Sequence, residues 1–98
     1  MAEKLKVGII GPGNIGTDLL YKLMKSDVLE VAMLAGIDES EGIKRARGMG
    51  IPVSTEGVKA VVDEGNIKIA FDCTSAGAHI KFNEPALRQA GIRVIDLT

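Results

Sequence analysis

Residues 7–16 read VGIIGPGNIG, and this stretch decides the fold because an apolar run ends there in a glycine-rich turn. Gly11, Gly13 and Gly16 have the G-x-G-x-x-G spacing that joins the first strand to the first helix in dinucleotide-binding folds. There the first glycine makes a tight turn, the second lets the backbone approach a pyrophosphate, and the third packs the helix on the strand. The first amide groups of the helix then point at the phosphates.

Four apolar runs are predicted to be strands, and they are nearly continuous rather than alternating, as in a parallel sheet covered by helices on both faces. These runs are residues 5–10, 29–37, 67–73 and 92–97. A shorter run at 51–53 suits an edge strand, because Pro52 has no N–H to donate to a neighbouring strand.

Apolar residues at helical spacing lie between these runs. One helix follows the glycine turn, a second contains Ile43 and Ala46, and a third contains Val58 and Val61. The last helix either starts near Asn83 or is a longer helix from about Ala78 that Pro85 kinks. The alternation of strand and helix predicts an α/β, Rossmann-type, doubly wound parallel sheet with strand order 3-2-1-4-5. Because no helix or sixth strand follows the last run, we expect this sheet to be truncated.

Composition restricts the class of protein. The 98 residues suit a single domain, residues 1–98, and the net charge of −1 argues against nucleic acid as a partner. No apolar run is as long as a membrane span, and no secretory signal is visible. The single cysteine excludes an internal disulfide and suits a reducing cytoplasm, where we expect the protein to be located.

Asp38 directly follows the second apolar run, where Rossmann folds place an acidic residue against the adenosine ribose. A carboxylate there accepts hydrogen bonds from the ribose hydroxyls, which indicates NAD rather than NADP. Two alternatives stay open. Asp38 is only a helix N-cap if the turn binds no ligand, and Lys44, Arg45 and Arg47 accommodate a 2′-phosphate if the cofactor is NADP.

The loop CTSAGAH at residues 73–79 follows the third long apolar run. In the doubly wound order this run lies beside the first strand, so its loop forms the other wall of the ligand crevice. Thr74, Ser75 and Ala76 are small enough for a nicotinamide ribose to lie close to them. Thr74 or Ser75 also suits the N-cap of the next helix, and both roles can hold together.

Several motifs together resemble the acylating acetaldehyde dehydrogenases of meta-cleavage pathways, in their order and their spacing. The motifs are KVGIIGPGNIGTDL, GID at 36–38, ARGMGIPVSTEGV, IAFDCTSAGAH and GIRVIDLT. The resemblance runs over nearly all 98 residues and covers about the N-terminal third of a family member.

The resemblance implies a complete enzyme that oxidises acetaldehyde with NAD and coenzyme A, giving acetyl-CoA and NADH through a cysteine thioester. It also implies pairing with 4-hydroxy-2-oxovalerate aldolase, and we expect an oligomer because an uncovered sheet edge invites association. By match, the pyrophosphate and neighbouring groups would contact Gly11, Pro12, Gly13, Asn14, Ile15, Gly16 and Thr17. The adenosine ribose would contact Asp38, and the nicotinamide side would contact Thr74, Ser75 and Ala76.

The resemblance places the nucleophilic cysteine after the strand that ends IDLT, so no catalytic residue is expected in these 98. Cys73 is explained as a small residue packed against the sheet. His79 is either a half-exposed structural residue or a general base that approaches the site. Asp72 and Asp96 are either caps or groups that contact the residues of the site rather than the ligand itself. One cysteine and one histidine cannot make a closed zinc site, so we expect no metal.

Two other functions remain open at this point. The chain could belong to another two-domain dehydrogenase, acting on a semialdehyde or an amino acid, although the SAGAH loop argues against this. It could also be a stand-alone nucleotide-sensing or assembly module, which binding of NADH by a compact chain would favour. We expect the chain by itself to bind the cofactor weakly and to turn nothing over.

Overall fold

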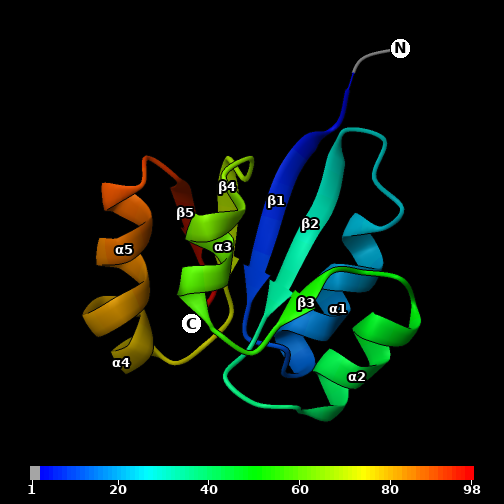
Figure 1. Ribbon diagram of the computed structural model, residues 1–98, viewed down its shortest axis with the longest axis horizontal. Helices are drawn as coiled ribbons and strands as arrows, with labels where there is room; N and C mark the ends of the chain where they lie inside the picture. The colour runs from blue at the N-terminus through cyan, green and yellow to red at the C-terminus, as the bar shows by residue number, and fades with distance from the viewer. Residues whose placement is uncertain (1–2) are drawn as a thin grey trace.

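The computed structural model describes residues 3–98 as a five-stranded parallel sheet with helices on both faces (Figure 1). The strands lie in the order β3-β2-β1-β4-β5, which confirms the predicted Rossmann-type topology. Their bounds are β1 (Leu5–Ile10), β2 (Leu29–Ala35), β3 (Val53–Ser54), β4 (Ile69–Asp72) and β5 (Arg93–Asp96). No helix in this described part of the chain is both long and apolar enough to cross a membrane.

Helices cover the sheet in two layers (Figure 1). The helices are α1 (Asn14–Leu23), α2 (Glu41–Gly48), α3 (Val58–Glu64), α4 (Ala76–Ala78) and α5 (Glu84–Gln89), with a π-helical segment η1 (His79–Asn83) between the last two. One apolar core joins the sheet to α1 and α2 through Leu20, Leu23 and Ile43. A second core on the opposite face contains Val61 of α3 and Leu87 of α5. Both faces are therefore buried, which explains the nearly continuous apolar strands.

The strands are shorter than the apolar runs that predicted them, except β1, which spans the predicted 5–10. β2 ends at Ala35 rather than at 37, because Gly36 and the residues after it already turn towards α2. The edge strand β3 contains only Val53 and Ser54, and Pro52 precedes it. Pairing with a neighbour, rather than apolarity alone, sets where each strand ends.

The last helical segment runs without a break from Ala76 to Gln89, which supports the longer of the two predicted helices. Its middle turn is π-helical, and the N–H of Glu84 donates to the carbonyl of His79, five residues earlier. Pro85 follows directly, and it has no N–H with which to continue an α-helical ladder. The wider turn therefore adapts the helix to the proline, and such turns are frequent at functional sites.

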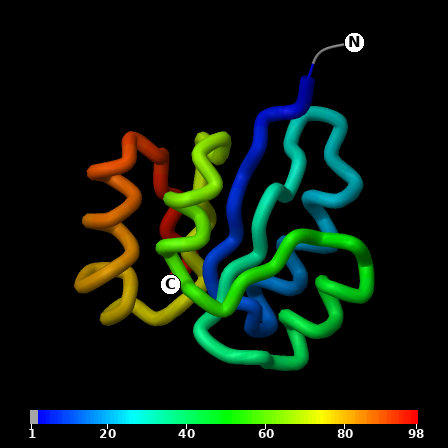
Figure 2. The backbone as a smooth tube through the Cα atoms, in the orientation of Figure 1, coloured from blue at the N-terminus to red at the C-terminus, as the bar shows by residue number. Residues whose placement is uncertain are grey.

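The backbone turns that follow β1, β2 and β4 lie at the same end of the molecule (Figure 2). This follows from the parallel sheet, in which all carboxyl ends share one edge. Because β1 and β4 are neighbours while their connections leave to opposite faces, a crevice opens between their loops. The fold thus brings the glycine turn and the loop after β4 together.

Candidate cofactor-binding site

The three glycines of the turn occupy different environments. Gly11 has a φ of +101°, and a Cβ there would lie 2.8 Å from the carbonyl oxygen of Cys73. A Cβ on Gly16 would lie 1.9 Å from the carbonyl oxygen of Gly11, so helix α1 can approach β1 only with glycine at this position. A Cβ on Gly13 would meet nothing within 4 Å. Two glycines are thus required by the protein itself, while the third faces open space.

Helix α1 begins without a side-chain cap. Its N-cap is Gly13, in an extended conformation, whereas Ser40 caps α2 by accepting a hydrogen bond from the N–H of Ile43 at 3.3 Å. The first amide groups of a helix lack partners within the helix. At α1 they point out at the glycine turn, which the Thr17 hydroxyl braces by donating to the carbonyl of Pro12 at 3.3 Å.

Pro12 is held by two glycines that sequence reasoning overlooked. A Cβ on Gly36, just after β2, would lie 2.9 Å from the Pro12 ring, and one on Gly42 in α2 would lie 2.1 Å from its carbonyl oxygen. The glycine turn is therefore packed against the start of α2 as well as against the loop after β4. The available signal was a pair of glycines beside the second strand–helix junction.

A cavity of about 510 Å³ lies between the two loops. Gly11 and Pro12 line it from the β1 side, and Thr74 and Ser75 line it from the β4 side, as the sequence predicted. Much of its remaining wall is apolar, and it includes Ile37 and Phe82, which are 86% and 64% exposed. Sequence reasoning did not identify these two side chains, although an apolar residue directly before Asp38 was a signal.

The other predicted residues lie around this cavity or on the far side of the turn. Gly13, Asn14 and Thr17 line a second hollow, of about 620 Å³, together with residues of α2. Ile15 is exposed on α1, Gly16 is buried beneath the turn, and Ala76 opens α4 next to Ser75.

Asp38 is exposed in the loop that follows Ile37. It is not the N-cap of α2, because Ser40 has that role, so the alternative reading of Asp38 as a cap is wrong. Arg47, one candidate partner of a 2′-phosphate, instead makes two 2.8 Å hydrogen bonds to Glu39 on the solvated surface. Ser75 does cap α4, accepting from the N–H of Ala78 at 3.2 Å.

A polar network lies behind the β4 loop, and sequence reasoning identified only its members, not their contacts. Asp72 is fully buried, and its carboxylate accepts hydrogen bonds from the amide and hydroxyl of Thr74. Asn83, also buried, donates to the same hydroxyl at 3.1 Å, and His79 Nδ1 lies 2.8 Å from the other oxygen of Asp72. The network holds the loop after β4 in one conformation. Within residues 3–98, no group of three or more potential ligands is placed to hold a metal ion.

Cys73 is unsuited to act as a nucleophile. Burial raises the pKa of its thiol to about 11, and the neighbouring Asp72 carboxylate adds to the effect. A thiol becomes nucleophilic only as the thiolate, so this cysteine is protonated at neutral pH. The structure thus supports the interpretation of Cys73 as a packing residue.

The raised pKa predicts slow alkylation of Cys73. At pH 8 iodoacetamide should modify the folded chain at least about tenfold more slowly than the urea-unfolded chain, because the folded thiolate is scarcer although intrinsically more nucleophilic. The rate for the folded chain should keep rising with pH towards about 11, where the thiol ionises. Mass spectrometry of quenched samples measures both rates, and equal rates would contradict the burial argument.

The sheet order, the glycine turn and the cavity between the β1 and β4 loops define a dinucleotide-binding Rossmann domain. The chain belongs to the family described as semialdehyde dehydrogenase, NAD binding domain, whose model matches residues 6–98. NAD is therefore its cofactor. The geometry fits this cofactor, because open space at Gly13 and uncapped amides at α1 are what a pyrophosphate needs.

Curated relatives are similar over the whole chain. An acetaldehyde dehydrogenase of Thermomicrobium roseum is 55% identical over 98 residues, which are 98% of this chain and 32% of that protein. An acetaldehyde dehydrogenase of Thermus thermophilus is 49% identical over 100 residues, covering 100% of this chain and 32% of the relative. The chain thus spans about a third of the length of the curated relatives it matches.

Solved structures support the fold. GenD2 from gentamicin A biosynthesis, in complex with NAD, superposes with a TM-score of 0.79 at 24% identity over 98% of this chain and 27% of its own. Scyllo-inositol dehydrogenase from Lactobacillus casei, with bound NAD(H), gives 0.82 at 19% identity over 96% and 28%. KijD10 from Actinomadura kijaniata, in complex with NADP, gives 0.78 at 24% over 96% and 29%. Since NAD and NADP both occur among these neighbours, the fold alone does not show which of the two cofactors binds.

Proposed function

We propose that the chain is the NAD-binding portion of an acetylating acetaldehyde dehydrogenase. The complete enzyme would convert acetaldehyde, NAD and coenzyme A into acetyl-CoA and NADH. The observation that carries this proposal is the similarity to acetaldehyde dehydrogenases, 55% and 49% identical along essentially the whole chain. The sequence motifs that resemble the acylating family include both loops that line the cavity, with Gly11 and Pro12 in one and Thr74 and Ser75 in the other.

In this proposal the chain's own residues bind and orient the cofactor. The amides from Gly13 to Gly16 would donate to the pyrophosphate, and the Asp38 carboxylate would accept from the adenosine ribose hydroxyls. The apolar side chain of Ile37 would contact the adenine, and Thr74 to Ala76 would contact the nicotinamide side. NAD, when bound, supplies the acceptor for the hydride that leaves the substrate.

The covalent step would use a cysteine outside residues 1–98, as the family resemblance implies. The protonated state of Cys73 supports this assignment, since no thiolate is available there at neutral pH. Coenzyme A would then release the acetyl group from the thioester on that external cysteine. The chain described here would thus contribute binding and orientation rather than bond breaking.

The function is tested with the protein that contains this domain and the segment following Thr98. Acetaldehyde and NAD should give sustained NADH absorbance only when coenzyme A is present, because the thioester otherwise accumulates after one turnover. NADH formation from a semialdehyde but not from acetaldehyde would replace the proposal with the semialdehyde reading, which the family description also allows. Binding of NADH without oxidation of any aldehyde would favour the sensing module.

We further propose that the complete enzyme pairs with 4-hydroxy-2-oxovalerate aldolase. The support is the family resemblance of the motifs, because an aldolase of this class releases acetaldehyde, the substrate proposed here. Co-elution of the two proteins in gel filtration is the expected result. Separate elution at micromolar concentrations would overturn the pairing.

The choice of NAD is tested at Asp38. Replacing Asp38 by asparagine should weaken NADH binding about tenfold, since hydrogen bonds to a charged group contribute about 1.5–3 kcal/mol. Binding of NADPH should improve, because the carboxylate no longer repels the 2′-phosphate. Fluorescence titration with both nucleotides measures the change, and Asp27→Asn is the matched control because it makes the same substitution at an exposed carboxylate in the loop before β2. An unchanged preference in Asp38→Asn would contradict the assigned role.

A further inference from the structure

We propose that His79 is a positioning residue that couples the β4 loop to the chain segment leaving β5. The inference rests on the proposed function, in which the β4 loop contacts the nicotinamide side of NAD and the reactive cysteine follows β5. A residue that links these two segments would hold the cofactor's reactive end in register with the nucleophile.

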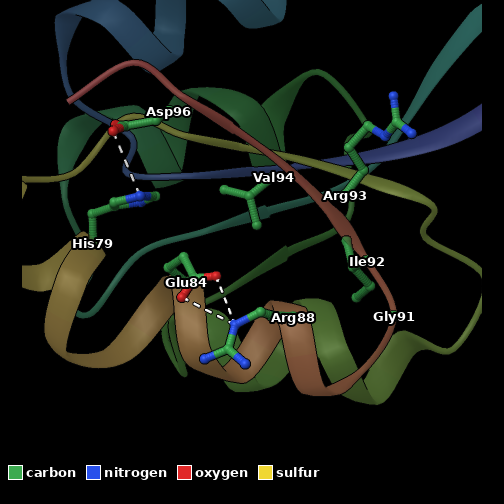
Figure 3. A pocket seen from close by; sticks show the side chains of 8 residues that line it. All are labelled: His79, Glu84, Arg88, Gly91, Ile92, Arg93, Val94 and Asp96. Atoms are coloured by element: carbon green, nitrogen blue, oxygen red, sulfur yellow. Dashed lines mark hydrogen bonds and ion pairs between the residues drawn. The ribbon is translucent and has the colours of Figure 1, made fainter.

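His79 lies between two carboxylates that end neighbouring strands. Its Nδ1 is 2.8 Å from Oδ2 of Asp72, at the end of β4, and its Nε2 is 3.5 Å from Oδ2 of Asp96, at the end of β5. Figure 3 shows the imidazole pointing from its helix towards Asp96. The His79 side chain is only 13% exposed and Asp72 is fully buried, so the first contact is shielded from solvent. One ring therefore contacts both strand ends.

On the cofactor side, the link continues into the β4 loop. The second oxygen of Asp72 accepts from the amide of Thr74 at 3.1 Å and from its hydroxyl. Asn83 donates to that hydroxyl from the other end of the π-helical segment. His79 and Asn83 are the first and last residues of this segment, so the wide turn presents both to the same network.

On the β5 side, the link continues to Thr98. Oδ1 of Asp96 accepts from the amide of Thr98 at 2.9 Å and from its hydroxyl. These hydrogen bonds from Thr98 lower the pKa of the Asp96 carboxyl, and the nearby His79 ring adds a smaller effect in the same direction. A continuous path of polar contacts thus joins Thr74 to Thr98 through His79.

His79 and Asp96 line a third hollow, of about 510 Å³, between α5 and β5. Its other charged lining residues are Glu84, Arg88 and Arg93, and none of them interrupts the contacts of His79. Arg88 pairs with Glu84 at 3.0 Å on α5. Arg93 points away from His79 in Figure 3. The imidazole therefore interacts chiefly with Asp72 and Asp96.

Two substitutions separate the two contacts of His79. His79→Asn keeps an amide nitrogen near the position of Nδ1, so it can still donate to Asp72, but it is too short to reach Asp96. His79→Ala removes both contacts and leaves the buried Asp72 carboxylate without its ring partner. Glu84→Gln is the matched control, since it breaks the exposed ion pair with Arg88 on the facing wall and leaves His79 untouched.

The test uses the ¹⁵N-labelled chain titrated with NADH and followed by amide NMR. In the wild type and Glu84→Gln, the Thr74 and Thr98 signals should shift together with one dissociation constant. His79→Asn should bind NADH within about twofold of wild type yet lose the Thr98 response, and His79→Ala should lose that response and bind about tenfold more weakly. A Thr98 response that persists in His79→Asn would overturn the proposal, and this variant decides the matter if His79→Ala fails to fold.

A second measurement needs no cofactor. In the free chain, His79→Asn should shift both the Thr74 and the Thr98 amide signals relative to the wild type, and Glu84→Gln should shift neither. If only Thr74 shifts, the coupling to β5 is wrong. Failure of the wild type to bind NADH would instead overturn the proposed function, so the two failures are distinguishable.

Discussion

Replacing Gly16 by alanine is expected to destabilise the domain by about 3 kcal/mol or more. The new Cβ would lie 1.9 Å from the backbone carbonyl oxygen of Gly11, and neither atom belongs to a flexible side chain. Relief requires α1 to move away from β1, which opens the core around Leu20 and Leu23. Urea unfolding followed by circular dichroism measures the loss, and NADH binding should disappear with it.

Gly48→Ala is the matched control for this experiment. Gly48 ends α2, and a Cβ there would meet nothing within 4 Å. Alanine should therefore stabilise the chain by up to about 1 kcal/mol, because it restricts the unfolded state and suits a helix. If Gly16→Ala and Gly48→Ala had equal unfolding midpoints, the close contact between α1 and the turn would be refuted.

Replacing Gly13 by alanine should have the opposite profile: normal stability and weak cofactor binding. The backbone at Gly13 is extended, with φ −77° and ψ −163°, and open space surrounds its Cβ position, so alanine fits the protein itself. A pyrophosphate against the α1 amides would occupy that space. NADH affinity should fall at least about tenfold, which is about 1.4 kcal/mol.

Fluorescence titration measures this affinity, and a urea midpoint close to that of the wild type shows that the fold survives. Gly48→Ala again serves as the control, with wild-type affinity expected because it lies outside both hollows. Tight NADH binding by Gly13→Ala would mean that the phosphates do not approach this part of the backbone.

The sequence predicted the topology well, because strong periodic patterns reflect burial on both faces of a parallel sheet. The β1 run and its glycine turn were predictable to the residue, since the turn requires particular backbone geometry at Gly11 and Gly16. The ends of β2 and β4 were less predictable, because apolar residues continue past the last paired residue. The convergence of the glycine turn with Thr74 and Ser75 is confirmed, and their contacts with NAD remain predictions.

The polar network around Asp72 was beyond sequence reasoning for a physical reason. Asp72, His79 and Asp96 meet only because β4 pairs with β5 and the helix between them contains a π-helical turn. No local spacing rule brings together residues from two strands and the helix that connects them. Individually, each residue allowed a surface or capping role, so only the tertiary structure revealed the contact.

The wedging of Pro12 between Gly36 and Gly42 has a consequence for how this fold can vary. Position 42 cannot acquire a side chain unless the first turn is rebuilt, because the obstacle is main chain rather than a movable group. Among related chains, position 42 should therefore remain glycine wherever the first turn keeps this backbone geometry. The orientation of α2 on the sheet therefore depends on the backbone geometry of the turn that precedes α1.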